Sequence, residues 1–315
     1  MLNLASYQRI MSIAERSAAL RVQHERIAGA MIVDAGVHVS GSLAAGVLMA
    51  QVCLGDLAEV TIVGEDSDRF ASDVAVMVQT DSPVLACLGG QYAGWPVSAG
   101  NYFAMGSGPM RMARGREEML LELELRELPE VVAGVLESTL MPTPEAIHLI
   151  ADQTNVAPEK LSLVVAPSGS IAGSVQVVAR SVETAMHKLH ALKFDVRSIF
   201  SAVGMAPIPP PAKPSDAMSG IGRTNDAILY GGRVTLWVDC EQRAIDDVAE
   251  AVPSCSSPDH GRPFSAIFKD AGHDFYKVDP HLFCPAVVTI INRRSGIARR
   301  AGAIQTDILR ESFFA

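Results

Sequence analysis

The chain has 315 residues, of which 49% are hydrophobic and 19% charged, so it is not a disordered chain and is long enough for a large core and two domains. The net charge of -9 argues against a nucleic-acid partner, because such sites concentrate Lys and Arg on one surface. A small-molecule ligand is the better expectation.

The N-terminal stretch MLNLASYQRIMSIAERSAAL is apolar but contains Arg and Glu, and no segment approaches about 18 uncharged apolar residues. The sequence therefore predicts neither a membrane span nor a signal peptide, and we expect a cytoplasmic protein.

Strand-like and helical segments alternate along the chain, which is typical of the α/β class. Strands are expected at 30–36, 58–64, 161–167 and 194–200, and helices at 41–55 and 171–192. We expect two α/β domains, residues 1–117 and 118–315, with an active-site cleft between them and with the chain free to cross from one to the other.

Two segments of the chain, 34–55 and 164–185, resemble each other weakly. Each runs from a strand through a Ser-Gly-Ser turn into a helix, which indicates two related α/β units. The second turn, Ser168, Gly169 and Ser170, has two interpretations. Small residues before a helix allow backbone N–H groups to hold an anion, but such a turn is more often a close-packed helix N-cap.

The segment CLGGQYAGWPVSAGNYFAMGSGP, residues 87–109, holds six glycines and four aromatic residues without a helical or strand period. It predicts a long ordered loop, a kind of segment that often has a function. Tyr92 and Trp95 are suited to stacking on a flat heterocycle or, equally, to anchoring the loop itself.

The expected helix 171–192 carries Arg180 and Glu183 three residues apart, with His187 on the same face. Its apolar residues form a separate stripe, so the periodicity alone places this ion pair on a solvated face. For this ion pair to have a chemical role, another part of the protein would have to cover that face of the helix.

Two later segments have unusual compositions. Five prolines, Pro207, Pro209, Pro210, Pro211 and Pro214, predict a rigid connector or a wall of a site. In SGIGRTNDAILYGG, Thr224 or Asn225 is expected to cap a helix, which leaves Arg223 to hold a carboxylate or phosphate. The Phe-rich segment 263–286 is expected to serve packing and turns.

Cysteine and histidine spacing predicts no metal site. The five cysteines are scattered without a C-x-x-C pair, so we expect reduced and mostly buried thiols. His187 and His190 have no further nearby partner in the sequence that would complete a ligand set.

Several long motifs together carry a family resemblance. ARSVETAMHKLHALKFDVRSIFSAVGMAPIPPPAK, IGRTNDAILYGGRVTLWVD, GGQYAGWPVSAGNYFAMGSGP and FSAIFKDAGHDFYKVDPHLFCPAVVTI occur in order between about residue 27 and about residue 292. The chain in this region closely resembles methenyltetrahydromethanopterin cyclohydrolase.

The resemblance implies a homotrimeric two-domain α/β enzyme that interconverts methenyl-tetrahydromethanopterin and N5-formyl-tetrahydromethanopterin with water, without a metal or redox cofactor. The pterin substrate would lie between the domains. In this family the Arg and Glu of the motif A-R-S-V-E-T carry out the chemistry, which implies that role for Arg180 and Glu183 here. The motif G-x-x-A-G-W places Gly90, Gln91, Tyr92 and Ala93 around the reacting carbon.

The hypothesis for the chemistry is that ionised Glu183 accepts a proton from water as a general base while Arg180 keeps it charged. Arg223 and the Ser168–Ser170 turn are candidates for distal polar contacts. Two alternatives remain open from the sequence: a non-catalytic pterin-binding or scaffold subunit, and a phosphotransferase that uses the Gly/Ser turns. The sequence has no phosphate-loop lysine after these turns, which counts against the phosphotransferase.

Overall fold

The computed structural model describes residues 1–213 and 216–314, and its chain divides into two compact units. The first unit contains Met1–Ala58 and Leu85–Gln176, and the second contains Glu59–Val84 and Val177–Ala315. Residues 117 and 118, where we expected the domain boundary, both lie inside the first unit. Each unit is built on a six-stranded mixed sheet with helices, which confirms the α/β class.

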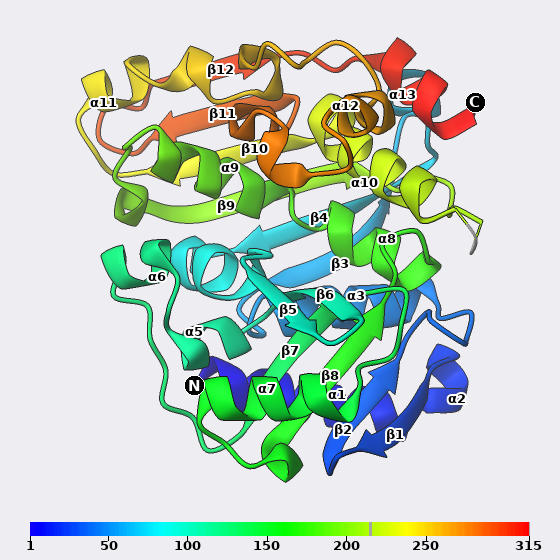
Figure 1. Cartoon of the computed structure of the whole chain (residues 1–315). Coiled ribbons are helices and arrows are strands. Elements are labelled where there is room, and N and C mark those ends of the chain that lie inside the picture. The colour runs from blue at the N-terminus through cyan, green and yellow to red at the C-terminus, as the bar shows by residue number, and fades with distance from the viewer. Residues whose placement is uncertain (214–215, 315) are drawn as a thin grey trace. The chain divides into compact units, whose positions relative to one another are not determined.

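The first unit holds a sheet of order β1-β2-β8-β7-β6-β5 (Figure 1). Its strands are β1 (Gln23–Ile27), β2 (Ala30–Asp34), β8 (Leu161–Ala166), β7 (Val132–Glu137), β6 (Tyr102–Ser107) and β5 (Trp95–Ala99). The central strands β2, β8 and β7 are parallel, and the outer pairs are antiparallel.

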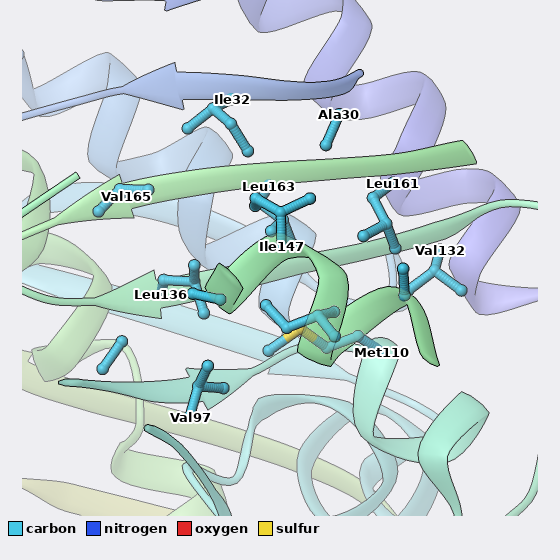
Figure 2. Close-up of a cluster of buried hydrophobic side chains, with 14 of the residues drawn as sticks. Ala30, Ile32, Val97, Met110, Val132, Leu136, Ile147, Leu161, Leu163 and Val165 are labelled. Carbon is cyan, nitrogen blue, oxygen red and sulfur yellow. The ribbon is translucent and has the colours of Figure 1, made fainter. Parts of the chain in front are cut away.

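Helices cover both faces of this sheet because its central strands are apolar on both sides. Leu163 and Val165 of β8 pack with α5 (Met110–Arg114) and α7 (Pro144–Thr154), as Figure 2 shows for Met110 and Ile147. Val164 lies in the opposite core, with α1 (Leu2–Glu15) and α3 (Leu43–Cys53). The remaining short elements are α2 (Ser17–Leu20), a π-helix at Val84–Gln91, α6 (Glu118–Glu122) and a 3-10 turn at Pro158–Lys160.

The second unit holds a sheet of order β12-β11-β10-β9-β4-β3 (Figure 1). Its strands are β12 (Ala298–Gly302), β11 (Val287–Asn292), β10 (Arg233–Val238), β9 (Ile199–Pro207), β4 (Val74–Thr80) and β3 (Glu59–Gly64). Only the β10–β11 pair is parallel among these neighbours.

The helices of the second unit are mostly short. They are α4 (Ser67–Phe70), α9 (Ser181–Ala191), α10 (Ala217–Gly231), α11 (Gln242–Asp246), α12 (Phe264–Asp270) and α13 (Thr306–Phe314). Single 3-10 turns occupy Val196–Ser198, Ala249–Ala251, Ser254–Ser256, Phe275–Lys277 and Pro280–Leu282. Phe264, Phe268 and Phe283 form one aromatic cluster, which confirms the packing role of this segment. No helix within the described residues has the length and apolar composition needed to cross a membrane.

Several expectations for local structure were wrong. Residues 194–200 are not a strand throughout, because Val196–Ser198 form a 3-10 turn and β9 begins only at Ile199. Residues 87–109 are not one long loop: they contain the end of the π-helix and the β5–β6 hairpin, in which Trp95 pairs with Gly106. The glycines and the proline conceal the strand alternation here. Residues 171–192 are not one helix either, because α8 (Ile171–Val178) ends before α9 begins at Ser181.

The strands that begin the two similar segments lie side by side in the first unit, and the second segment continues past Gln176 into the second unit. Each contributes one of the parallel neighbours β2 and β8, followed by its turn and helix. A Cβ atom on Gly36 would come within 2.7 Å of Ser170 Cβ, so the two post-strand loops touch each other.

Candidate active site

Arg180 and Glu183 form a buried ion pair at the start of α9. Nη1 of Arg180 lies 3.8 Å from Oε2 of Glu183, and the two side chains are only 7% and 5% exposed. The expectation of a solvated face was therefore wrong. The periodicity assumed one continuous helix, whereas the break at Ala179 and Arg180 starts a new helix.

The backbone at this break places the acid in the first turn of α9. Arg180 occupies the N-cap position, and its carbonyl oxygen accepts hydrogen bonds from Thr184 N at 2.9 Å and Thr184 Oγ1 at 3.1 Å. Glu183 lies where the helix dipole favours negative charge. The guanidinium of Arg180 and the N-terminus of α9 both place positive charge near the Glu183 carboxylate, in surroundings largely closed to water.

The first turn of α9 rests directly on the sheet of the second unit. A Cβ atom on Gly204 of β9 would come within 2.8 Å of Val182 Cγ2 and 3.1 Å of Val182 N, and it would overlap Ser181 Oγ. A glycine at this point therefore permits the close approach that fixes the height of Glu183 above β9.

A buried lysine anchors the other end of α9. Lys188 is 1% exposed, and its Nζ donates to Ser256 Oγ at 2.9 Å and to the carbonyl oxygen of His281. Burial lowers the pKa of this ammonium group. His187 and His190, on the same helix, are partly buried. Lys188 was missed in the sequence because its acceptors lie far along the chain.

The residues expected around the reacting carbon lie in the first unit, at the end of the π-helix. Gly90 and Gln91 are buried, whereas Tyr92 and Ala93 are partly exposed. Tyr92 N donates to Cys87 O at 2.9 Å, a bond of π-helical spacing. A Cβ atom on Gly90 would overlap the carbonyl oxygen of Cys53, so only glycine fits there.

Trp95 follows this segment as the first residue of β5. It is 1% exposed, and the guanidinium of Arg114 lies 4.7 Å from its ring centroid. Burial lowers the pKa of Arg114, and the neighbouring Glu117 opposes that shift. This position favours the anchoring role of Trp95 over stacking on a ligand.

A second arginine holds this segment and was also missed. Arg111 is completely buried and donates to the carbonyl oxygens of Leu88 and Gly90, at 3.0 and 3.2 Å, and to the carboxylate of Glu117. A lone charge inside the apolar run Met110–Ala113 was the only sign of it in the sequence.

Both Ser-Gly-Ser turns act as helix N-caps. Ser42 Oγ accepts from Ala45 N at 3.1 Å, and Ser170 Oγ accepts from Gly173 N at 3.0 Å. Ser170 also donates to Pro167 O at 2.8 Å. Ser168 is buried, and its carbonyl oxygen accepts from Ser174 Oγ at 3.1 Å.

Arg223 lies in α10 of the second unit and spans two backbone segments. Its Nε donates to Ser312 O at 3.2 Å, and its Nη1 lies 3.4 Å from Pro210 O and 3.3 Å from Pro211 O. It thus fastens the proline segment to the C-terminal helix. The last proline expected in that segment, Pro214, lies outside the described residues.

The expected helix cap at Thr224 or Asn225 was wrong. Both residues lie inside α10, whose N-cap is Asp216, which accepts from Ser219 N at 2.9 Å. Helix α10 begins at Ala217, earlier in the chain than the polar residues Thr224 and Asn225 indicated. Thr224 and Asn225 instead bond the preceding turn, at Gly220 O and Ile221 O.

A cavity of about 330 Å³ in the second unit contains none of the expected site residues. Its lining includes Glu65, Phe70 and Arg233, and Arg233 is paired with Glu65 at 2.6 Å and lies over the Phe70 ring. Within the described residues, no cluster of three or more His, Cys, Asp or Glu side chains is arranged to hold a metal ion. Cys53, Cys87 and Cys284 are buried and are not joined by disulfide bonds.

The comparisons with known proteins agree over nearly the whole chain. Residues 1–313 match the family model described as Cyclohydrolase (MCH). The chain is 59% identical over 290 residues to the methenyltetrahydromethanopterin cyclohydrolase of Rhodopirellula baltica, covering 91% of this chain and 87% of that relative. It is 41% identical over 306 residues to the protein of that name from Methylobacillus flagellatus, covering 96% and 92%. It is 42% identical over 313 residues to that from Methanoregula boonei, covering 99% and 97%.

Proposed function

The chain belongs to the methenyltetrahydromethanopterin cyclohydrolase family, and from this premise we propose that Glu183 and Arg180 perform the chemistry of its reaction. The enzyme interconverts methenyl-tetrahydromethanopterin plus water and N5-formyl-tetrahydromethanopterin. The observation that supports the proposal is the buried pair at the start of α9.

The methenyl carbon is bonded to two nitrogens that share a positive charge, so it is already electrophilic. In the proposed first step, water forms a C–O bond to this carbon while Glu183 accepts one of its protons. The C–N10 bond of the resulting adduct then breaks, N10 takes up a proton, and the carbonyl of the N5-formyl group forms. The net change is release of one proton, because a cation and water become a neutral product.

Arg180 has two proposed tasks in this scheme. Its fixed positive charge keeps Glu183 ionised, and its planar group orients the attacking water. The negative charge of Glu183 also stabilises the cationic substrate. Since burial weakens competition from solvent, these interactions are stronger than they would be on a solvated helix face.

The substrate contacts are proposed from the family motif. Gly90, Gln91, Tyr92 and Ala93 are proposed to line the reacting carbon with backbone groups. The backbone at Gly90 is held close to the carbonyl oxygen of Cys53, which leaves no room for a side chain there. Trp95 holds the end of this segment in place.

The polar tail of the substrate is proposed to reach Ser168–Ser170 or Arg223. Ser170 precedes α8, whose residues rise by about 1.5 Å each, and Arg180 follows only after α8 has ended at Val178. A group held at the turn is therefore separated from the reacting carbon by the length of α8. A long ligand is therefore required to touch both. We further propose a cytoplasmic homotrimer that needs no metal or redox cofactor.

The test is the absorbance of the methenyl chromophore during hydrolysis by the wild type and by Glu183→Gln, without added metal or nucleotide. We expect fast loss of the chromophore with the wild type and a decrease in rate of about 10² or more with the variant. Glu241→Gln is the matched control, because Glu241 is 86% exposed. Equal rates for wild type and Glu183→Gln would make the pair structural, and a wild type without turnover would favour a scaffold subunit or, with nucleotide-dependent activity, a phosphotransferase.

A further inference from the structure

Every nitrogen of the buried Arg111 guanidinium has an acceptor. Nη1 lies 3.0 Å from Leu88 O, 3.4 Å from Gly89 O and 3.2 Å from Gly90 O. Nε donates to both carboxylate oxygens of Glu117, at 2.9 and 3.1 Å, and Nη2 donates to Oε2 of the same residue. One side chain thus joins three consecutive carbonyl groups to an acid.

These carbonyl groups form the C-terminal end of the π-helix Val84–Gln91. The last carbonyls of any helix have no partner within the helix, and they carry partial negative charge. Arg111 supplies both the donors and the positive charge, and Gly108 N adds a bond of 2.8 Å to Gly90 O. The end of the π-helix is therefore capped by a charged group from a distant part of the chain.

The guanidinium of Arg111 also contacts the side chain of Tyr92, the first residue after the π-helix. It sits 5.0 Å from the ring centroid of Tyr92, within reach of a cation–π interaction. A Cβ atom on Gly94 would overlap Glu117 Oε2 and approach the Tyr92 ring to 2.7 Å. Glycine at position 94 thus leaves space for Tyr92, Arg111 and Glu117 to pack together.

We propose that Arg111 is a positioning residue for the reaction, because it fixes the backbone of Gly90–Ala93 at the reacting carbon. The inference rests on the proposed role of that backbone in the cyclohydrolase. Arg111 does not touch the substrate itself; it acts through the carbonyl groups that it holds. A lysine would keep the charge but would lose the fork that binds Glu117 and the carbonyls together.

The experiment compares Arg111→Lys with Ile147→Val, a substitution in the α7 core of the same unit that leaves the π-helix contacts intact. Both variants are measured by steady-state hydrolysis of the methenyl substrate and by hydrogen exchange of a peptide covering residues 84–94. For Arg111→Lys we expect kcat/KM to fall about 10- to 100-fold and exchange to become at least about tenfold faster, because small misplacements at a reacting centre are costly. For Ile147→Val we expect exchange in this peptide to be unchanged and kcat/KM to stay within about twofold.

A second variant keeps the test decisive if Arg111→Lys folds poorly. Glu117→Gln retains Arg111 and its bonds to the carbonyls but removes the anion, so we expect faster exchange at 84–94 and a smaller decrease in kcat/KM. Unchanged exchange, or a kcat/KM equal to that of Ile147→Val, would overturn the positioning role. A wild type without turnover would overturn the proposed function instead, and the exchange measurement would still show whether Arg111 orders the segment.

Discussion

The guanidinium of Arg180 and the carboxylate of Glu183 face each other across 3.8 Å, in a place where both side chains are more than nine-tenths buried. This separation is longer than a direct hydrogen bond, so the contact is a charge–charge interaction and not a bidentate hydrogen-bonded pair. Because a buried charge is costly without its partner, each residue constrains what can replace the other.

Arg180→Lys is expected to lower kcat by about tenfold or more, although the positive charge is retained. The ammonium group cannot orient both a carboxylate and a water as the planar fork does. The assay is absorbance-monitored hydrolysis of the methenyl substrate. Arg243→Lys is the matched control, because Arg243 is 91% exposed in its i,i+4 pair with Asp247. Equal kcat for the two lysine variants would contradict the proposed role of Arg180.

Gly204→Ala is expected to lower the free energy of unfolding by about 1–3 kcal/mol, because the new methyl group must displace Ser181 or the backbone of Val182. The shift moves the first turn of α9, so kcat should fall as well. Gly64→Ala in β3 of the same sheet is the control: a Cβ atom there has nothing within 4 Å. Chemical denaturation and the hydrolysis assay measure the two effects, and equal behaviour of both alanine variants would argue against a close α9–β9 contact.

The regular elements with clear periodicity could be predicted from the sequence. The apolar runs at 30–36 and 161–167 do contain β2 and β8, because strands buried on both faces read as continuous apolar segments. The β5–β6 hairpin could not be recognised, since Pro96 and Gly106 interrupt its alternation. A strand could thus be predicted only where its own side chains form a clear apolar pattern.

The candidate site could be predicted from the sequence less completely than the fold. Family motifs made Arg180 and Glu183 the candidates, but helical periodicity predicted an exposed surface for them because it continued through a break in the helix. Arg111 and Lys188 were missed for another reason. Their acceptors, such as Leu88 O and His281 O, are backbone atoms brought close only by tertiary folding.

Ser170→Ala is expected to reduce the free energy of unfolding by about 1 kcal/mol, because Gly173 N loses its cap. If the turn also binds the substrate tail as proposed, KM should rise. Ser42→Ala removes the same kind of cap from α3 in the same unit and should cost similar stability without changing KM. Thermal or chemical unfolding and KM values for both variants separate the roles, and unchanged KM in Ser170→Ala would leave only the structural one.

Asp226 predicts a specific pH dependence of stability. It is completely buried in α10, where its Oδ1 accepts from Phe264 N at 2.8 Å, and burial raises its pKa from 3.8 to about 7. Between these values the folded state retains a proton that the unfolded state has released, so rising pH favours unfolding. This group should therefore decrease the free energy of unfolding between about pH 4 and pH 7, by at most about 4 kcal/mol at 1.36 kcal/mol per unit of pKa.

Asp226→Asn should remove this decrease, because the amide oxygen can still accept from Phe264 N but no proton is exchanged. Urea unfolding of wild type and variant at several pH values from 4 to 8 gives the difference directly, with the other titrating groups common to both. The stability of the variant relative to wild type should rise with pH across this window and become constant above it. Asp247→Asn serves as the control, since that carboxylate is 66% exposed and should leave the profile unchanged. Parallel profiles for wild type and Asp226→Asn would mean that Asp226 is already ionised in the folded protein near pH 4.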